Sequence, residues 1–222
     1  MMQINTDHAL RVVINTHEVA WTAAPVPGVH RRFLERDGEE LARATAIVRY
    51  EKGAAFSSPT HEGGEEILVL EGTLIDEWGN YGPGTYLKNP AGTQPTPRSG
   101  SGCTLFVKLR HLDPDDQQRV NINTQQSSWY QGLVPGLSVL PLSEYGSQHT
   151  ALVRWAPNTF FQPHRHYGGE EIYVLEGTFE DEHGSYPTGT WIRSPHGSLH
   201  QPYSRTGCLI WVKTGHLSVA LA

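Results

Sequence analysis

Residues 164–177 read H-R-H-Y-G-G-E-E-I-Y-V-L-E-G, and this stretch decides how the rest of the chain is interpreted. His164 and His166 are two positions apart, so in a β-strand their side chains face the same side. The two glycines that follow let the backbone turn, and Glu170 can then return a carboxylate to the same point. Because imidazole and carboxylate together suit Zn, Fe, Mn, Ni or Cu, the stretch predicts a metal site.

A fourth ligand candidate lies downstream, at His200 in S-P-H-G-S-L-H-Q-P. Glu171 competes with Glu170 for the carboxylate position. His183 and His196 are expected to be turn or surface residues. The alternative interpretation is a set of solvated polar side chains at a turn, but the spacing and the apolar segment that follows favour a buried site.

The same pattern occurs twice in the chain. H-E-G-G-E-E-I-L-V-L-E-G-T begins at His61 and aligns with H-Y-G-G-E-E-I-Y-V-L-E-G-T at His166, an offset of 105 residues (166 minus 61). About half of the positions in 61–111 are identical to their partners, without a gap. Upstream, Trp21 aligns with Trp129 at an offset of 108 (129 minus 21). Such repetition indicates two copies of one module, which we assign to residues 10–112 and 121–218 with a polar linker at 112–118.

The segments of each module are short and turn-bounded. Those at 171–175 and 209–213 are apolar or alternate in polarity, and glycines or prolines stand between such segments, which is typical of strands. Close turn spacing without a long amphipathic helix predicts an all-β chain of double-sheet barrels or jelly rolls. Only residues 31–44 form a helix candidate, a weak one that Gly38 interrupts.

Composition limits the function classes. The net charge is -6 and no Lys/Arg cluster occurs, so we expect no direct nucleic-acid partner. We find neither a leader-like basic and apolar N-terminus nor an apolar stretch of about 18 residues, which predicts a cytoplasmic protein without a membrane partner. Cys103 and Cys208 form no C-x-x-C pair and are expected to be reduced thiols.

The second module resembles the cupin superfamily. H-x-H-x3-E followed by P-x4-H is similar to the two cupin motifs that place four metal ligands inside a jelly roll. H-x-H-x-G-G-E-E-x-x-V-L-E-G, D-E-x-G-x-Y, P-x-G-S-x-H and G-C-x-x-x-V-K are more closely similar to ChrR-type cupins, the C-terminal domain of ChrR anti-sigma factors that restrain ECF-class sigma factors. The resemblance covers nearly the whole chain and implies two tandem cupin modules, a bicupin.

The resemblance also implies a ligand set. Carried over by position, the ligands are His164, His166, Glu170 and His200, the four residues already selected. It places the carboxylate at the first glutamate of the pair, with Glu171 facing the other way. It implies one divalent metal ion, with zinc as the first choice and iron, manganese or nickel as alternatives.

The first module departs from this pattern. Pro59 aligns with His164 and Pro95 with His200, so that only His61 and Glu65 remain of the four. Two ligands rarely hold a metal against water. We therefore expect the first module to be metal-free or weakly binding, with a structural role.

Three functions fit these expectations. The first is a regulatory or sensor bicupin whose metal receives a small-molecule or oxidant ligand. The second is a metal-dependent enzyme, a dioxygenase, hydrolase or isomerase, and its candidate pocket groups are Tyr173, Trp191, Arg193 and Trp211. The third is a structural or storage protein. We favour the first, because the second module keeps a complete ligand set while nothing names a substrate.

The partners of such a regulator are less defined by the sequence. ChrR anti-sigma factors clamp the sigma factor with a separate helical zinc domain that contains C-x-x-C. This chain begins directly with the cupin module and has no such pair. We therefore do not expect a direct sigma-factor clamp of that kind, and a homodimer remains compatible with the sequence.

Overall fold

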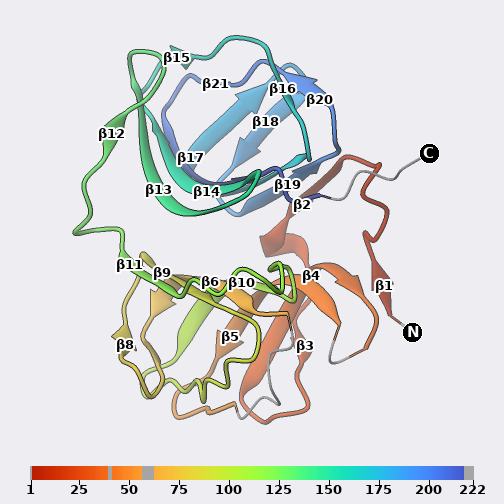
Figure 1. Cartoon of the computed structure of the whole chain (residues 1–222), viewed down its shortest axis with the longest axis vertical. Helices are drawn as coiled ribbons and strands as arrows, with labels where there is room; N and C mark the ends of the chain where they lie inside the picture. Colours follow the sequence, from red (N-terminus) through yellow and green to blue (C-terminus); the bar gives the residue numbers. More distant parts are fainter. Residues whose placement is uncertain (1, 40–41, 57–62, 218–222) are drawn as a thin grey trace. The chain divides into compact units, whose positions relative to one another are not determined.

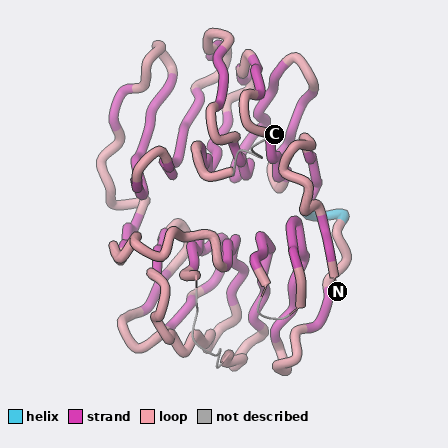
Figure 2. The backbone as a smooth tube through the Cα atoms, turned by 45° about the vertical axis from the view of Figure 1, so that its right-hand side comes forward, coloured by secondary structure: helices cyan, strands magenta, loops and turns pink. Residues whose placement is uncertain are grey.

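The computed structural model describes residues 2–39, 42–56 and 63–217. They form strands, turns and loops, with one 3-10 turn, η1, at Thr16–Glu18, which is the single cyan segment of Figure 2. The all-β prediction is confirmed. The chain divides into two compact units: unit 1 comprises Met1–Thr6 and Val19–Ser127, and unit 2 comprises Asp7–Glu18 and Ser128–Ala222.

Unit 1 contains one large antiparallel sheet with the strand order β1-β4-β5-β10-β6-β9-β11, and β3 pairs with β4. A separate short pair is formed by β7 and β8. The strands are β1 (Gln3–Ile4), β3 (Thr22–Ala23), β4 (Val29–Asp37), β5 (Arg43–Tyr50), β6 (Glu65–Gly72), β7 (Leu74–Ile75), β8 (Asn80–Tyr81), β9 (Thr85–Asn89), β10 (Cys103–Leu109) and β11 (Val120–Asn123).

Unit 2 has the matching sheet order β12-β13-β14-β22-β17-β19-β2. The strands of this sheet are β2 (Val12–Asn15), β12 (Tyr130–Gln131), β13 (Leu137–Tyr145), β14 (Gln148–Trp155), β17 (Glu170–Asp181), β19 (Thr190–Ser194) and β22 (Cys208–Thr214). The second layer consists of β15 (Thr159–Phe160), β16 (His164–His166), β18 (Gly184–Pro187), β20 (Ser198–His200) and β21 (Tyr203–Ser204). In Figure 1, β16, β20 and β21 lie on the side of unit 2 opposite β14, β19 and β2.

The long strand β17 belongs to both layers of unit 2. Its first half pairs with β19 and β22 in the large sheet, and its second half pairs with β18 and β21. Glu170 at its start and Asp181 at its end therefore belong to opposite layers of one barrel. Between the layers lies a core that includes Trp155, Ile172 and Phe179.

The two repeats exchange their first strands. β2 lies before the first repeat's other strands in the chain, yet it pairs with β19 of unit 2. β11, at the start of the second repeat, pairs with β9 of unit 1. The division into units accordingly places residues 7–18 with the second module and residues 19–127 with the first. Each barrel is thus completed by the first strand of the other repeat.

The weak helix candidate at 31–44 is not a helix in its described residues, because 31–37 lie in β4 and 43–44 lie in β5. Arg, Leu and Glu favour helices, but this preference is small and tertiary packing overrides it. Phe33 is buried in the core of unit 1, while the guanidinium groups of Arg31 and Arg36 lie over its ring at 5.0 and 4.4 Å. Arg43 in β5 forms an ion pair of 3.3 Å with Glu35.

No helix in the described part of the chain has the length and apolar character that crossing a membrane requires.

Candidate metal centre

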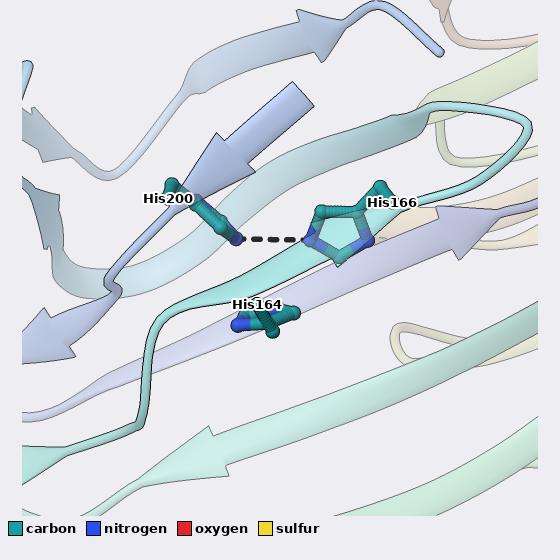
Figure 3. Close-up of side chains that lie close together, drawn as sticks. All are labelled: His164, His166 and His200. Atoms are coloured by element: carbon teal, nitrogen blue, oxygen red, sulfur yellow. Dashed lines mark hydrogen bonds between the residues drawn. The ribbon is translucent and has the colours of Figure 1, made fainter. Parts of the chain in front are cut away.

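Two short strands bring three histidines together. β16 pairs antiparallel with β20, and the register sets His164 directly opposite His200. His164 and His166 face one side of β16, as predicted, while Arg165 between them is exposed. The three rings have centroids 4.6 to 5.0 Å apart, and Figure 3 shows them converging from the two strands. One ring nitrogen from each lies within 4.8 Å of the others, which is close enough for a shared metal ion.

The hydrogen bonds of these rings leave nitrogen lone pairs available. The Nδ1–H of His164 donates to the carbonyl oxygen of Gln162 at 3.0 Å, which leaves Nε2 as the acceptor. The Nε2 atoms of His166 and His200 lie 3.0 Å apart (Figure 3). One of these two atoms must carry a hydrogen for that contact to be a hydrogen bond. A metal ion would instead accept the lone pairs of both.

Glu170 adds a carboxylate to the histidines. It is the first residue of β17 and is buried. Its Oε1 lies 3.4 Å from His166 Nε2, and its Oε2 lies 3.6 Å from His200 Nε2. Oε2 is fully buried and has no hydrogen-bond partner among the residues that the structure describes. Buried polar atoms are rarely left in this state, so this oxygen is a vacant acceptor aimed at the histidines.

Glu171 points to the opposite side of the sheet, as the strand alternation requires. Its Oε1 lies 3.0 Å from Nε2 of His216, and both side chains are almost completely buried. Of the two glutamates, Glu170 faces the histidine cluster and Glu171 faces His216.

Burial shifts the pKa values of several groups in the site away from those of solvent-exposed residues. Burial, together with the neighbouring rings of His200 and His164, lowers the pKa of His166 to about 3. The pKa of His164 is also lowered, mainly by burial. Burial raises the pKa of Glu170 to about 7. Neutral imidazoles are the form that binds metals, so His164 and His166 are ready to coordinate, while Glu170 becomes ionised only near neutral pH.

Asp181 is a functional residue that the sequence reasoning missed. Its Oδ2 lies 3.7 Å from Nδ1 of His200, which is longer than a hydrogen bond but within ion-pair range. Although burial opposes it, the neighbouring His200 ring and the hydrogen bond from Tyr186 lower the pKa of Asp181 to about 2. Burial favours neutral His200, but Asp181 and Glu170 outweigh it and raise the pKa of His200. The D-E-x-G-x-Y pattern contained this aspartate, but both repeats carry that pattern, so it did not single out the metal site.

The glycine pair between the histidines and the glutamate is required by close packing. Gly168 and Gly169 have φ angles of 77° and 69°, in the left-handed region that favours glycine. A Cβ on Gly168 would lie 2.7 Å from the backbone of Gly215. The backbone N–H of Gly168 donates to Nδ1 of His196 at 2.8 Å. His196 therefore supports the turn, in line with its expected turn position, and the side chain of His183 is half-exposed.

The four proposed pocket groups of an enzyme do not line the barrel interior. Interior positions alternate with those on the other face of each strand, and Ile172, Ile192 and Ile210 belong to the interior core. The residues next to these isoleucines therefore face away from the histidines. They are the four candidate pocket groups, Tyr173, Trp191, Arg193 and Trp211.

Cys208 does lie in the interior core. Burial raises its pKa to about 11, so its thiol is protonated and unreactive at neutral pH.

The first unit has a different arrangement at the equivalent place. Pro59 and His61 lie outside the described residues. Glu65, the counterpart of Glu170, accepts a hydrogen bond of 2.8 Å from the side-chain amide of Asn89. Pro95, in the place of His200, is buried in a loop. Within the ranges that the structure describes, the three histidines of unit 2 form the single cluster suited to a metal.

The donor set of unit 2 fits a divalent transition metal. Three imidazoles and one buried carboxyl group converge, and Oε2 of that carboxyl group has no hydrogen-bond partner among the described residues. Zinc sites are commonly built from such ligands, and iron, manganese and nickel accept them as well. The geometry thus supports a metal centre without choosing the metal.

Family comparisons agree with this architecture. The model of the ChrR cupin-like domain matches the chain twice, at residues 9–113 and 117–218. The chain belongs to the ChrR cupin-like family. The two matches cover both repeats, so this ChrR-like protein is a duplicated cupin, as the resemblance implied. A search of curated proteins found no significant match.

Solved structures share the fold of the ChrR-like bicupin at low sequence identity. A protein from Nostoc punctiforme described as a putative dioxygenase aligns with a TM-score of 0.78 and 16% identity, over 96% of this chain and 85% of that one. Protein Ylba from E. coli aligns with a TM-score of 0.72 and 17% identity, over 97% and 95%. Oxalate decarboxylase from Lactobacillus farciminis aligns with a TM-score of 0.67 and 11% identity, over 97% and 88%. These likenesses establish the bicupin fold.

Proposed function

We propose that the ChrR-like bicupin binds one divalent metal ion in its second unit and acts as a regulatory sensor of a small molecule or oxidant. His164, His166, Glu170 and His200 are the proposed ligands. The observation that supports this most directly is the buried Oε2 of Glu170, which has no hydrogen-bond partner among the described residues and lies 3.6 Å from His200. A metal ion would satisfy this oxygen and the histidine lone pairs together.

The site combines a closed side and an open side. The side chains of His166, His200 and Glu170 are 7 to 10% exposed, whereas His164 is only partly buried. The ring of Phe161 packs edge-on against His164 at 5.0 Å, and Phe179 lies 6.3 Å from His200. A ligand would therefore approach past His164, between apolar rings. When bound, a divalent ion supplies Lewis acidity and an open position for such a ligand.

The surroundings of the histidines favour a sensor over an enzyme. Proton-transferring groups beyond the ligands are expected in a catalytic pocket. Asp181 is the neighbouring acid, and it is already occupied by hydrogen bonds from Tyr186 and Arg11. The aromatic and basic residues suggested as pocket groups face the other side of the sheet. The two free cysteines fit a reducing, cytoplasmic compartment, and we assign the protein there.

A metal-dependent enzyme is the second candidate. Two of the proteins that share the fold are described as a putative dioxygenase and an oxalate decarboxylase. The partly open position beside His164 would also admit a small substrate. Zinc is the metal that we propose for the sensor, whereas bound iron or manganese would favour the enzyme.

Two measurements distinguish the sensor from the enzyme: the identity of the bound metal and the consumption of oxygen. Protein purified without an affinity tag and without added metal is analysed for bound elements, and then assayed with an oxygen electrode against a panel of small organic acids. Bound zinc without oxygen uptake supports the sensor. Bound iron or manganese, with uptake that His164→Ala abolishes, would replace the sensor by the oxygen-using enzyme.

A further inference from the structure

Three hydrogen-bond donors hold the Oδ1 atom of Asp181, and its Oδ2 atom is available for other contacts. Its Oδ1 accepts hydrogen bonds from the backbone N–H groups of His183 at 2.8 Å and Gly184 at 3.0 Å. The hydroxyl of Tyr186 donates to the same oxygen at 2.7 Å. Oδ2 is then the oxygen that faces Nδ1 of His200.

Arg11 holds that second oxygen. Its Nη2 donates to Oδ2 of Asp181 at 3.1 Å and to the hydroxyl of Tyr186 at 2.8 Å. The guanidinium also lies over the Tyr186 ring, 5.4 Å from its centre. Arg11 directly precedes β2, the strand that pairs with β19 of unit 2. The arginine therefore reaches the site because the N-terminal strand completes this barrel.

The first unit offers a matched comparison. Asp76 accepts the same bonds from the backbone at Trp78 and Gly79 and from the hydroxyl of Tyr81. Arg119 is the counterpart of Arg11, at the offset of 108 residues (119 minus 11).

There, the arginine also interacts with the tyrosine that binds the aspartate, but its other contacts differ. Arg119 donates to the side-chain oxygen of Asn89 at 3.3 Å and lies 3.8 Å from the centre of the Trp78 ring. Pro95 occupies the position of His200, so the first unit has no imidazole at that position of the repeat. The contact between the arginine and the second aspartate oxygen is therefore found in unit 2, the unit that has a proposed histidine ligand at this position.

We infer that Arg11 is a positioning residue for the metal centre: through Asp181 it orients His200 so that Nε2 faces the other ligands. A metal-binding histidine commonly directs its second ring nitrogen at a carboxylate, which fixes the ring orientation and the tautomer. Arg11 fixes the carboxylate in turn, with a charge-assisted hydrogen bond. This inference rests on the proposed metal function and adds that the chain's N-terminal strand sets the affinity of a site far away in the sequence.

The test compares zinc affinity among five variants of the full chain: Arg11→Ala, Arg11→Lys, Asp181→Asn, the double variant Arg11→Ala/Asp181→Asn and the control Arg119→Ala. Zinc is titrated against a chromophoric chelator at pH 7.5. The visible absorption of the cobalt(II)-loaded protein reports the ligand geometry, and the melting temperature of the metal-free protein reports folding. Roughly 10- to 100-fold weaker binding is expected for Asp181→Asn, and about tenfold for Arg11→Ala.

The cobalt spectrum should change in both variants, Arg11→Lys should recover part of the affinity, and Arg119→Ala should bind as the unaltered protein does. Because Arg11 acts through Asp181, Arg11→Ala should add little in the Asp181→Asn background. Equal affinity and an equal spectrum in Arg11→Ala and the unaltered protein would overturn the role of Arg11 alone. An equal loss in Arg119→Ala, or fully additive losses in the double variant, would also overturn it. An unaltered protein that binds neither zinc nor cobalt would instead overturn the metal function itself.

Discussion

The carboxylate of Glu65 and the side-chain amide of Asn89 are joined by a hydrogen bond of 2.8 Å in unit 1. The equivalent register pair in unit 2 is Glu170 and Ser194. There the Oε2 atom of the glutamate has no hydrogen-bond partner among the described residues. An asparagine therefore satisfies the glutamate in the first unit, whereas the second unit leaves the acceptor for a metal ion. This difference gives a physical reason for expecting a single metal site.

Exchanging the residues at positions 89 and 194 is predicted to affect zinc binding in unit 2 and stability in unit 1. Ser194→Asn should weaken zinc binding, because the new amide can occupy Glu170. Asn89→Ser should leave zinc binding unchanged, but should lower the free energy of unfolding by about 1–3 kcal/mol, because it removes a buried hydrogen bond to a carboxylate. Zinc titration and urea unfolding of both variants measure these effects. Unaltered zinc binding in Ser194→Asn, with a correctly folded protein, would contradict this account.

Glu170→Gln is predicted to stabilise the metal-free protein at high pH. Burial raises the folded-state pKa from 4.5 to about 7. Below pH 4.5 the carboxyl is protonated in both states and has no effect. Between pH 4.5 and about 7 the unfolded state loses its proton first, so stability falls as the pH rises. Above pH 7 the buried carboxylate is ionised, and this lowers the free energy of unfolding by its full amount, on the order of 3 kcal/mol.

The glutamine variant removes this penalty. In the presence of a chelator, it should therefore melt higher than the unaltered protein at pH 8 and equally at pH 4. Thermal melts at the two pH values measure the difference. Glu144→Gln, at an exposed side chain, is the control and should change neither melt. A lower melting temperature of Glu170→Gln at pH 8 would show that the carboxylate is stabilised by something other than a metal.

Zinc affinity is predicted to rise with pH through neutrality. The raised pKa values of Glu170, about 7, and of His200 mean that both groups carry protons below neutral pH. Zinc must displace these protons, so the affinity should change about tenfold per pH unit for each proton released. His166, with a pKa of about 3, stays neutral and adds no dependence in this range. Titrations from pH 6 to 8 should give a shallower slope in Glu170→Gln; the same slope in both proteins would rule out this assignment.

Much of the fold could be predicted from the sequence, because the repeat and the turn residues are local signals. The i, i+2 spacing placed His164 and His166 on one strand face, and the glycine turn brought Glu170 back to them. The exchange of β2 and β11 between the repeats could not be predicted, because sheet pairing at an edge leaves no local pattern. Asp181 was missed for a related reason: its distance from His200 depends on how β17 spans both layers.

At 31–44, in contrast, the local sequence pattern indicates the wrong secondary structure. Its charged residues have some helix preference, but Phe33 is buried in the core and arginines cover its ring. Long arginine stems can pack on apolar surface while their head groups remain polar. Packing thus made a strand from a sequence with weak helical character.

Both cysteines are predicted to react slowly in the folded protein. Burial raises the pKa of Cys208 to about 11 and also raises the pKa of Cys103. Since the thiolate is the reactive form, a thiol reagent at pH 8 should label neither residue until the protein is denatured. Counting labelled thiols before and after denaturation measures this. Rapid labelling of Cys208 in the native protein would favour a sensor based on thiol oxidation instead of the metal.

The most direct test of the central claim is the metal content per chain of the unaltered protein, His200→Ala and His61→Ala, measured by elemental analysis after purification without a tag or added metal. The account predicts about one divalent metal ion per chain, as expected for one complete set of ligands. His200→Ala should lose it and melt at a lower temperature, because bound metal stabilises the native state. His61→Ala should retain it. Metal that His61→Ala removes and His200→Ala retains would contradict the assignment of the centre to the second unit, and about two ions per chain would contradict a metal-free first unit.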